Sequence, residues 1–295
     1  MRLEDILRPT AKAVLPLYAA FHMVNAAPVS AQPNPKSTYN FIVGTMHKND
    51  GNLELALKSY LNALVADPNS AYLHNEMAEL LMDVNRIDDA VMYLKNAVRL
   101  DRDFMRPHAN LAMIQVLKKD YKGAIDESSF ILSKEPDNIS GLSISAESYF
   151  KLKDYSKARP LFTRMVELDV HPESVSHSTY RLGQINFQDS EYFLAVADFK
   201  KAFIMLNRTD PFDRLKGLDI LHYITLSYYH MGKFNSAKET LSTLDSLMSK
   251  EVNPYLSPAI NELRKRINDQ DLIRKIDEGI QNKTNRATPN NAIPR

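Results

Sequence analysis

Small and large apolar residues recur along this chain with a constant step. One series of small residues, with a step of 34 positions, consists of Gly44, Ala78, Ala112 and Ala146. A second series, with the same step, consists of Ala56, Ala90, Ala124 and Ala158. A large residue stands three positions before each member of the second series, at Leu53, Ile87, Tyr121 and Tyr155. Spacing of this kind predicts pairs of amphipathic helices, in which small residues allow close approach and large ones fill the space between pairs.

The pattern continues beyond the fourth unit with two insertions. A fifth unit contains Leu182-Gly183, Ala195 and Phe199, after about three extra residues around His171-Pro172-Glu173. A sixth contains Tyr228, Phe234 and Ala237, after an excess of about eight residues between Asn207 and Lys216. Because one helix pair cannot bury its apolar face alone, the units must stack into an array. We therefore predict an all-α solenoid of about six pairs over residues 37–250.

The two ends of the array read differently. Ser257-Pro258 is a helix start, and the residues after it predict a capping helix over 251–281 with one apolar stripe, made of Ile260, Leu263, Ile267, Ile273, Ile276 and Ile280. Residues 282–295 are predicted to be a disordered tail. At the other end, residues 32–36 are predicted to be a linker.

The first 31 residues favour an export signal. Arg2, Arg8 and Lys12 precede the apolar run at residues 13–24, and a small-x-small site ends at Ala31. The alternative is an amphipathic helix that stays attached to a cytosolic protein. The apolar run is shorter than the ~20 residues that a membrane span needs. We expect a periplasmic or otherwise exported protein, with a cytoplasmic one as the alternative.

Composition and motifs limit the kinds of functional site that the chain can contain. The chain of 295 residues has a net charge of +1, which does not favour nucleic-acid binding, and it has no cysteine, which excludes disulfides and thiol chemistry. We find no glycine-rich phosphate loop, no H-E-x-x-H and no G-x-S-x-G motif. His74, Glu76 and Glu79 resemble a ligand cluster, but on a helix the carboxylates point about 200° and 140° away from His74. We therefore predict no catalytic residue, no metal and no cofactor.

The units resemble the tetratricopeptide repeat, a 34-residue helix–turn–helix. Val43-Gly44, Ala56, Tyr60, Ala63 and Pro68 match its pattern in the first unit, and Leu182-Gly183, Ala195, Phe199 and Ala202 match it in the fifth. The family's tryptophan is absent; the corresponding positions hold Asn40, His74, His108, Leu142, Thr179 and Leu221. The resemblance implies that His74 packs in this slot.

The resemblance also implies a function. The first helix of each pair lines the inside of a superhelix in this family, and peptides bind there. The implied groove residues are Tyr72, Asn75, Glu76, Glu79, Arg106, Asn110, Met113, Glu147, Phe150, Tyr180, Arg181, Gln184, Phe187, His222, Tyr223, Tyr229 and His230. The carboxylate clamp of some co-chaperones is not expected, because Phe41, Thr45 and Glu76 stand at its positions.

We therefore expect a non-enzymatic scaffold or adaptor that holds a partner protein or peptide, with assembly of a periplasmic or cell-envelope complex as the setting. Two alternatives remain: a cytosolic adaptor with a retained N-terminal helix, and an accessory ligand-binding or enzyme-associated module. A homo-oligomer is compatible with either, because the ends of a short solenoid can pair.

Overall fold

The apolar pattern forms helices throughout the part of the chain that the computed structural model describes, which is residues 34–168, 171–207, 209–248 and 257–287. No strand occurs in these residues. The helices are α2 (Pro35–Asn49), α3 (Leu53–Ala66), α4 (Ala71–Asp83), α5 (Ile87–Leu100), α6 (Met105–Leu117), α7 (Tyr121–Lys134), α8 (Ile139–Lys151), α9 (Tyr155–Leu168), α10 (Pro172–Gln188), α11 (Tyr192–Ile204), α12 (Pro211–His230), α13 (Phe234–Met248) and α14 (Ser257–Ala287).

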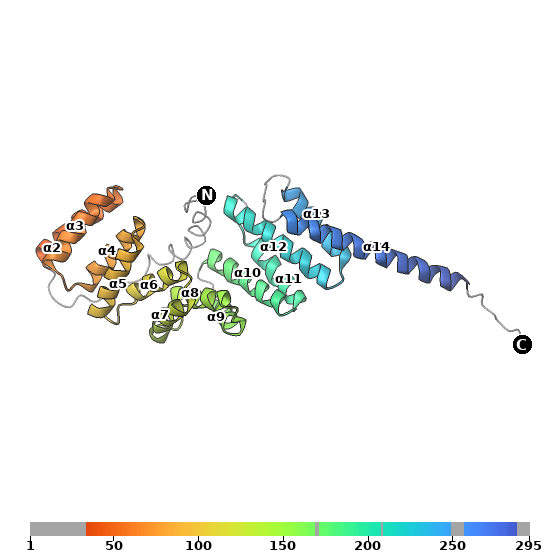
Figure 1. The fold of residues 1–295 in the computed structure, drawn as a ribbon, viewed down its shortest axis with the longest axis horizontal. Helices are drawn as coiled ribbons and strands as arrows, with labels where there is room; N and C mark the ends of the chain where they lie inside the picture. The colour runs from red at the N-terminus through yellow and green to blue at the C-terminus, as the bar shows by residue number, and fades with distance from the viewer. Residues whose placement is uncertain (1–33, 169–170, 208, 249–256, 288–295) are drawn as a thin grey trace, which may run out of the picture. The chain divides into compact units, whose positions relative to one another are not determined.

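These helices pack as antiparallel pairs in sequence order, from α2 with α3 to α12 with α13 (Figure 1). The repeated alanines Ala56, Ala78, Ala90, Ala112, Ala124, Ala146 and Ala158 are all completely buried. Gly44 shows why small residues are needed, since a Cβ there would lie 2.3 Å from Cδ1 of Tyr60. The prediction of a helical-pair solenoid is confirmed.

The turn inside each pair uses one residue with positive φ. In the first four pairs these residues are Gly51, Asn85, Lys119 and Lys153, 34 positions apart, and Ser190 and Gly232 serve the last two pairs. The joint between pairs is different: Ser70 accepts a hydrogen bond from the backbone N–H of Leu73 and caps α4, just after Pro68. Both kinds of turn are short, so consecutive helices within each unit lie side by side.

The described helices form two compact units that divide between Leu168 and Asp169. Unit 1 holds α2–α9, and unit 2 holds α10–α14. The division falls where the repeat loses its 34-residue step, just before His171.

Unit 2 shows that most of the extra residues lengthen helices. α10 has 17 residues and α12 has 20, against 13 in α4, α6 and α8. Pro172 and Pro211 stand in the first turn of these helices, and Asp210 caps α12 by accepting from the N–H groups of Phe212 and Asp213. The expected insertion at 207–216 is therefore mostly the first turns of α12.

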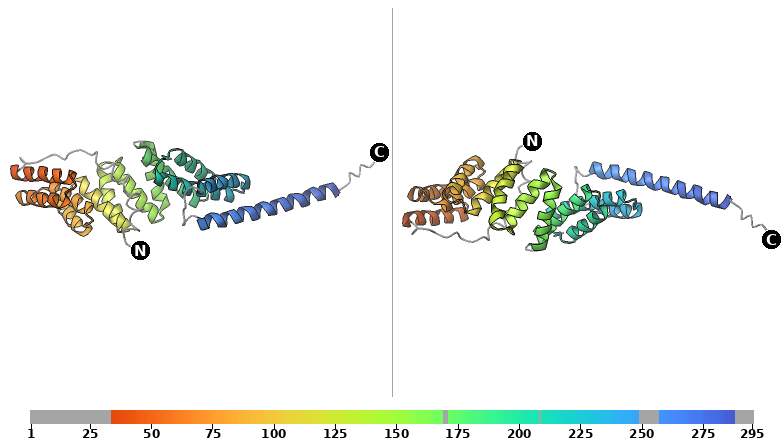
Figure 2. Two further views of the ribbon diagram at one scale, coloured as in Figure 1. Left: turned by 90° about the horizontal axis from the view of Figure 1, so that it is seen from above. Right: turned by 90° about the horizontal axis from the view of Figure 1, so that it is seen from below.

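α14 differs from the expected cap in two respects. Ile260, Leu263 and Ile267 are buried against α12 and α13, but Leu272 and Ile273 are 59% and 52% exposed. The single stripe is wrong, because the six residues from Ile267 to Ile273 rotate the helix to a face about 120° away. In both views of Figure 2 the C-terminal part of α14 extends past α13. The side chains of Ile276 and Ile280 lie outside the described part.

Two predicted boundaries also move. α14 runs to Ala287, six residues beyond the expected end at 281, since no proline interrupts it before Pro289. α2 begins at Pro35, inside the expected linker 32–36, because Asn34 accepts hydrogen bonds from the N–H groups of Lys36 and Ser37. The expected export signal at 1–31 and the end of the tail at 288–295 lie outside the described residues. None of the described helices has the length and hydropathy needed to cross a bilayer.

Candidate partner-binding site

Unit 2 brings four of the predicted groove residues together around a buried tyrosine. Tyr180 on α10 donates a hydrogen bond to Asp219 on α12, and Gln184 Nε2 donates to the Tyr180 hydroxyl over 2.7 Å. Arg181 in turn donates to Gln184 Oε1 over 2.8 Å, and Gln184 also lies 3.4 Å from the hydroxyl of Tyr223. Residues four apart on one helix face supply both sides of this network. Burial, and then the nearby Asp219 carboxylate, raise the pKa of Tyr180, so its phenol stays protonated.

Aromatic rings extend this network toward the C-terminal end of α12. Tyr223 stacks on the fully buried Phe199, with 5.1 Å between ring centroids, and Phe187 meets Tyr223 edge-on at 5.4 Å. His230 lies over Tyr192 at 4.9 Å with the two rings nearly parallel, and it is also in contact with Phe187. We call Phe187, Tyr192, Tyr223 and His230 the ring cluster. His230 is exposed and the other three are half-buried.

The two remaining predicted residues of unit 2 flank the ring cluster. Tyr229 is half-buried between His230 and Phe234. His222 is half-buried beside Tyr223, and its buried Nδ1 has no hydrogen-bond partner. Burial lowers the pKa of His222, and Asp219 opposes this effect. His222 is therefore kept neutral by its surroundings.

Unit 1 gathers most of its predicted residues into a second network, between α4 and α6. Glu79 accepts hydrogen bonds from Asn75 at 2.8 Å, from Arg106 at 2.8 and 3.0 Å, and from Asn110 at 3.1 Å. Asn110 also donates to Oδ1 of Asn75, and Arg106 forms an ion pair with Glu76 at 3.1 Å. Asn75, Glu79 and Asn110 are buried. These predicted groove residues therefore form a largely internal network, in which Arg106 is engaged by the carboxylates of both Glu76 and Glu79.

Tyr72 lies at the edge of this network beside Glu76, whose side chain is only 12% exposed. Tyr72 is 40% exposed and packs edge-on against Phe41 of α2. Burial is the main cause that raises the pKa of Glu76, and Glu79 adds to it, whereas Arg106 opposes it. The pKa of Tyr72 rises to about 12, through burial and then through Glu76. Burial at this edge therefore favours the protonated forms of both side chains.

The other predicted residues of unit 1 lie apart from this edge in the sequence. Phe150 packs on Tyr155 and Phe162 of the next helix, so most of its ring supports its own pair. Met113 and Glu147 are half-buried on α6 and α8. The binding role of all these residues stays a prediction.

The histidines in the tryptophan slot have a packing role. His74 Nε2 lies 3.0 Å from the carbonyl oxygen of Pro68, and His108 Nε2 lies 3.2 Å from that of Arg102, in each case six residues earlier. His108 also stacks on Phe130 and contacts Glu127. Each histidine ties its helix to the turn before it. In the described residues no group of three or more His, Cys, Asp or Glu side chains could hold a metal ion.

Sequence reasoning missed several members of both networks. Asp219 and Tyr192 complete the site of unit 2, and Phe41 and Lys48 border that of unit 1, where Lys48 pairs with Asp83 at 3.0 Å. Asp219 could have been found, because it stands four residues before Tyr223 on one helix face. Tyr192 comes from a second helix, so the groove pattern of first helices gave no signal for it.

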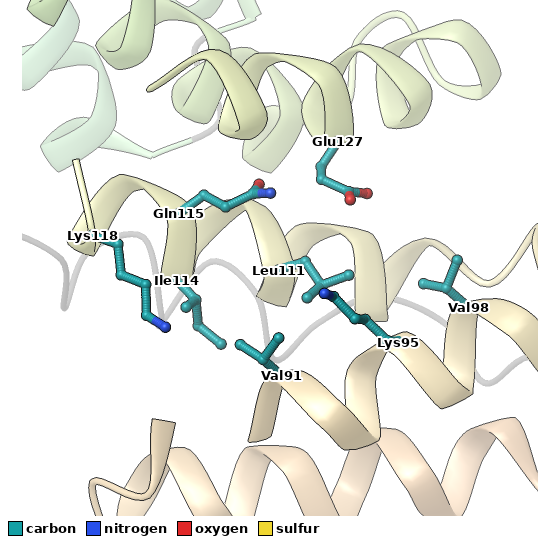
Figure 3. Close-up of a pocket in the computed structure, with 8 residues that line it drawn as sticks. All are labelled: Val91, Lys95, Val98, Leu111, Ile114, Gln115, Lys118 and Glu127. Carbon is teal, nitrogen blue, oxygen red and sulfur yellow. The ribbon is translucent and has the colours of Figure 1, made fainter. Parts of the chain in front are cut away.

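A separate cavity of about 250 Å³ lies among α5, α6 and α7 (Figure 3). Its apolar lining residues are Val91, Val98, Leu111 and Ile114, and its polar lining residues are Lys95, Gln115, Lys118 and Glu127. None of the predicted groove residues lines this cavity. It is smaller than the ~300–1,000 Å³ of typical ligand pockets.

No protein-family model matches the chain. Human neutrophil cytosol factor 2 is 27% identical over 159 residues, which are 51% of this chain and 29% of the human protein. The match therefore spans less than a third of that relative. Among solved structures, YrrB, a tetratricopeptide repeat protein with an unusual peptide-binding site, superposes with a TM-score of 0.57 at 20% identity, covering 69% of this chain and 97% of YrrB.

Two further solved structures agree with YrrB. PilF of Pseudomonas aeruginosa has a TM-score of 0.54 at 16% identity, covering 72% of this chain and 91% of PilF. MamA of Desulfovibrio magneticus RS-1 has a TM-score of 0.54 at 17% identity, covering 59% and 97%. This chain has the tetratricopeptide repeat fold. The expectation drawn from the repeat pattern is confirmed, and the repeat positions can now be compared between pairs.

Proposed function

We propose that this chain is a non-enzymatic adaptor that binds an extended segment of a partner protein on unit 2, where α10, α11 and α12 contribute the ring cluster. The observation that carries the proposal is the ring cluster. Aromatic side chains are the groups that most often supply binding energy at protein interfaces. Here one ring is exposed, three are half-buried, and all are fixed by ring contacts to their neighbours.

Preorganisation supports this proposal. Phe199 holds Tyr223 from below, and the network of Tyr180, Gln184 and Asp219 fixes α10 against α12. A partner therefore would not have to order these side chains when it binds, which removes a cost of about 0.5–1.5 kcal/mol for each immobilised side chain. Arg181 stands at the edge of the network and supplies a donor beside the rings. The peptide-binding site of the structurally similar YrrB is consistent with this use of the fold.

The proposal is tested with peptides selected from a displayed library on the intact chain. A double variant, Tyr192→Ala and His230→Ala, removes the stacked pair of rings from the ring cluster. It should lower the affinity for a selected peptide by about tenfold or more, since each such ring contributes about 1 kcal/mol or more to binding. Phe193→Ala is the matched control, because Phe193 follows Tyr192 on α11 but is 71% exposed and has no ring contact among the described residues. Equal binding by all three proteins would show that the ring cluster is not the site.

We further propose that the protein is exported and acts in the assembly of a periplasmic or cell-envelope complex. The basic residues before the apolar run and the small-x-small site ending at Ala31 support this. The intact mass of the protein from its native host provides the test, with cleavage after Ala31 as the expected result. A retained N-terminus would instead favour a cytosolic adaptor.

A further inference from the structure

The first helix of unit 1 exposes two positions, Tyr39 and Met46, that every later first helix of the unit buries. On α2, Tyr39, Ile42 and Met46 lie on one side and are 68%, 53% and 61% exposed. Their spacing of three and four residues aligns them in one stripe. We call these three residues the α2 stripe. Because apolar side chains gain free energy when they leave water, such a stripe favours a covering partner.

The same repeat positions are covered in the next three pairs. The positions 34, 68 and 102 residues after Met46 are Leu80, Ile114 and Ser148, which are 0%, 1% and 0% exposed. The positions equivalent to Tyr39 are Leu73, Pro107 and Gly141, all buried. A Cβ on Gly141 would lie 3.0 Å from Leu132 of α7, so this face packs on the preceding pair. Tyr39 and Met46 of the α2 stripe therefore occupy positions that face the preceding pair in the later repeats.

The opposite end of the repeats is closed. In unit 2, Ile260, Leu263 and Ile267 of α14 are 1%, 3% and 0% exposed and cover the last pair, α12 and α13. A second copy therefore cannot add its first pair to the end of this array, as head-to-tail stacking would require. The α2 stripe is an exposed apolar surface at a repeat position, and it can pair with the same surface of another copy. Contact of a surface with itself is isologous, and it closes at a dimer.

The residues around the α2 stripe are self-complementary. Lys36 and Asp50 flank the stripe at equal distances in sequence from Val43, and both side chains are exposed and have no ion-pair partner among the described residues. When two α2 helices pack antiparallel about a two-fold axis, Lys36 of each copy lies beside Asp50 of the other. The same arrangement places Met46 opposite Tyr39, which is a favourable sulfur–aromatic contact.

We propose that the α2 stripe is a homodimer interface, in which two copies of the chain pack their α2 helices antiparallel with reciprocal Lys36–Asp50 ion pairs. One helix pair buries less than a standard interface of ~1,600 Å². The dimer is therefore weak, and it forms and dissociates with protein concentration.

Sedimentation velocity of the full chain over a concentration series tests the proposal. The wild type should shift from monomer to dimer, and Met46→Glu should weaken dimerisation by at least tenfold, because it buries two carboxylates at the interface. Ile204→Glu is the matched control: Ile204 is 76% exposed on α11, and this variant should dimerise like the wild type. Ile273→Glu controls for pairing through the exposed residues of α14. Circular dichroism melts identify any variant that loses its fold.

A charge exchange provides an independent second test. Lys36→Asp and Asp50→Lys should each weaken the dimer severalfold, and the double variant should restore it. Both changes are favourable for the isolated helix, since they place an anion at its N-terminus and a cation at its C-terminus. Loss of α2 therefore cannot explain a weaker dimer. Rescue by the double variant supports the antiparallel arrangement, and failure of rescue overturns it.

The same series would reveal a different occupant of the α2 stripe or a different dimer interface. A wild type that stays monomeric at every concentration overturns the proposal. If hydrogen exchange then shows α2 protected in the full chain but not after removal of residues 1–31, the apolar run at 13–24 covers the stripe instead. Dimerisation that Ile273→Glu abolishes and Met46→Glu does not would place the interface on α14 and also overturn the proposal.

Discussion

The guanidinium of Arg106 donates to both carboxylate oxygens of Glu79, at 2.8 and 3.0 Å, and so joins α6 to α4 across 27 residues of sequence. Asn75 and Asn110 donate to the same carboxylate. Glu79 is therefore the shared acceptor of this network. Glu76, one turn earlier on α4, has a different environment. It forms a single ion pair with Arg106, and burial raises the pKa of its carboxyl group.

This difference predicts opposite effects of the same substitution at the two glutamates. Glu79→Gln should lower the free energy of unfolding of unit 1 by about 3 kcal/mol, because it leaves buried donors facing an amide and weakens the Arg106 pair. Glu76→Gln should leave stability unchanged or raise it slightly, because a raised pKa means that the ionised form is less favourable in the folded state. Urea unfolding at pH 7 measures both. Equal losses would contradict the assignment of Glu79 as the shared acceptor.

His222 predicts a pH dependence of stability in unit 2. Its pKa is lowered by burial, so the unfolded chain takes up the proton first as the pH falls through about 6.5. The stability that neutral His222 provides is present above that pH and is lost below it. Melting temperatures at pH 7.5, 6.5 and 5.5 should fall more steeply for wild type than for His222→Gln. Parallel curves would show that His222 is not responsible.

Two glycines on first helices predict the effect of crowding by a neighbouring helix. Gly44→Ala should destabilise the first pair by about 1–3 kcal/mol, since the new Cβ would overlap the Tyr60 ring at 2.3 Å and must displace it. Gly217→Ala is the matched control, because its nearest neighbour is Phe203 at 3.3 Å and alanine gains helix propensity. We expect little loss, or a small gain, at Gly217. Thermal melts of the two variants test the difference.

The left-handed turn residues predict stabilising substitutions. Lys119→Gly and Lys153→Gly should each raise the free energy of unfolding by about 0.5–1 kcal/mol, because glycine adopts a positive φ without steric cost. Lys151→Gly, two residues before Lys153 and still inside α8, should instead cost about 1 kcal/mol. Chemical denaturation of the three variants provides the measurement. A lower free energy of unfolding for Lys119→Gly and Lys153→Gly would mean that the two lysine side chains stabilise the fold by more than their backbone strain costs.

The periodic part of the fold could be read from sequence because each small residue has one structural role. Ala56 to Ala158 mark close approaches between helices, and close approach tolerates no larger side chain. The turns gave a weaker signal, since Asn85, Lys119, Lys153 and Ser190 adopt a conformation that sequence patterns attribute to glycine. The repeat pattern does not distinguish the long α10 and α12 from inserted loops, because a prolonged helix and a loop shift the repeat by the same number of residues.

The candidate site was predicted less well than the fold. Helix position showed which side chains point to one face, and Tyr180, Gln184 and Tyr223 do lie together. The position of a residue on its helix could not show that Glu79 and Asn75 are buried. Their burial depends on the long side chain of Arg106, which extends from the next helix pair to Glu79. Nor could helix position supply Tyr192, which comes from a second helix. Contacts between repeats depend on the length and conformation of individual side chains, and the repeat spacing gives no information on these.

The constant step of the left-handed turns in unit 1 has a consequence for how this chain could change in length. Gly51, Asn85, Lys119 and Lys153 sit at equivalent joints, so a genetic exchange between any two of them removes or duplicates whole 34-residue blocks. Each new junction would meet backbone of the same conformation and helices of the same length. Insertions of other sizes would require a new turn. Unit 1 can therefore grow or shrink by whole repeats, whereas an exchange between Ser190 and Gly232 in unit 2 would join first helices of unequal length.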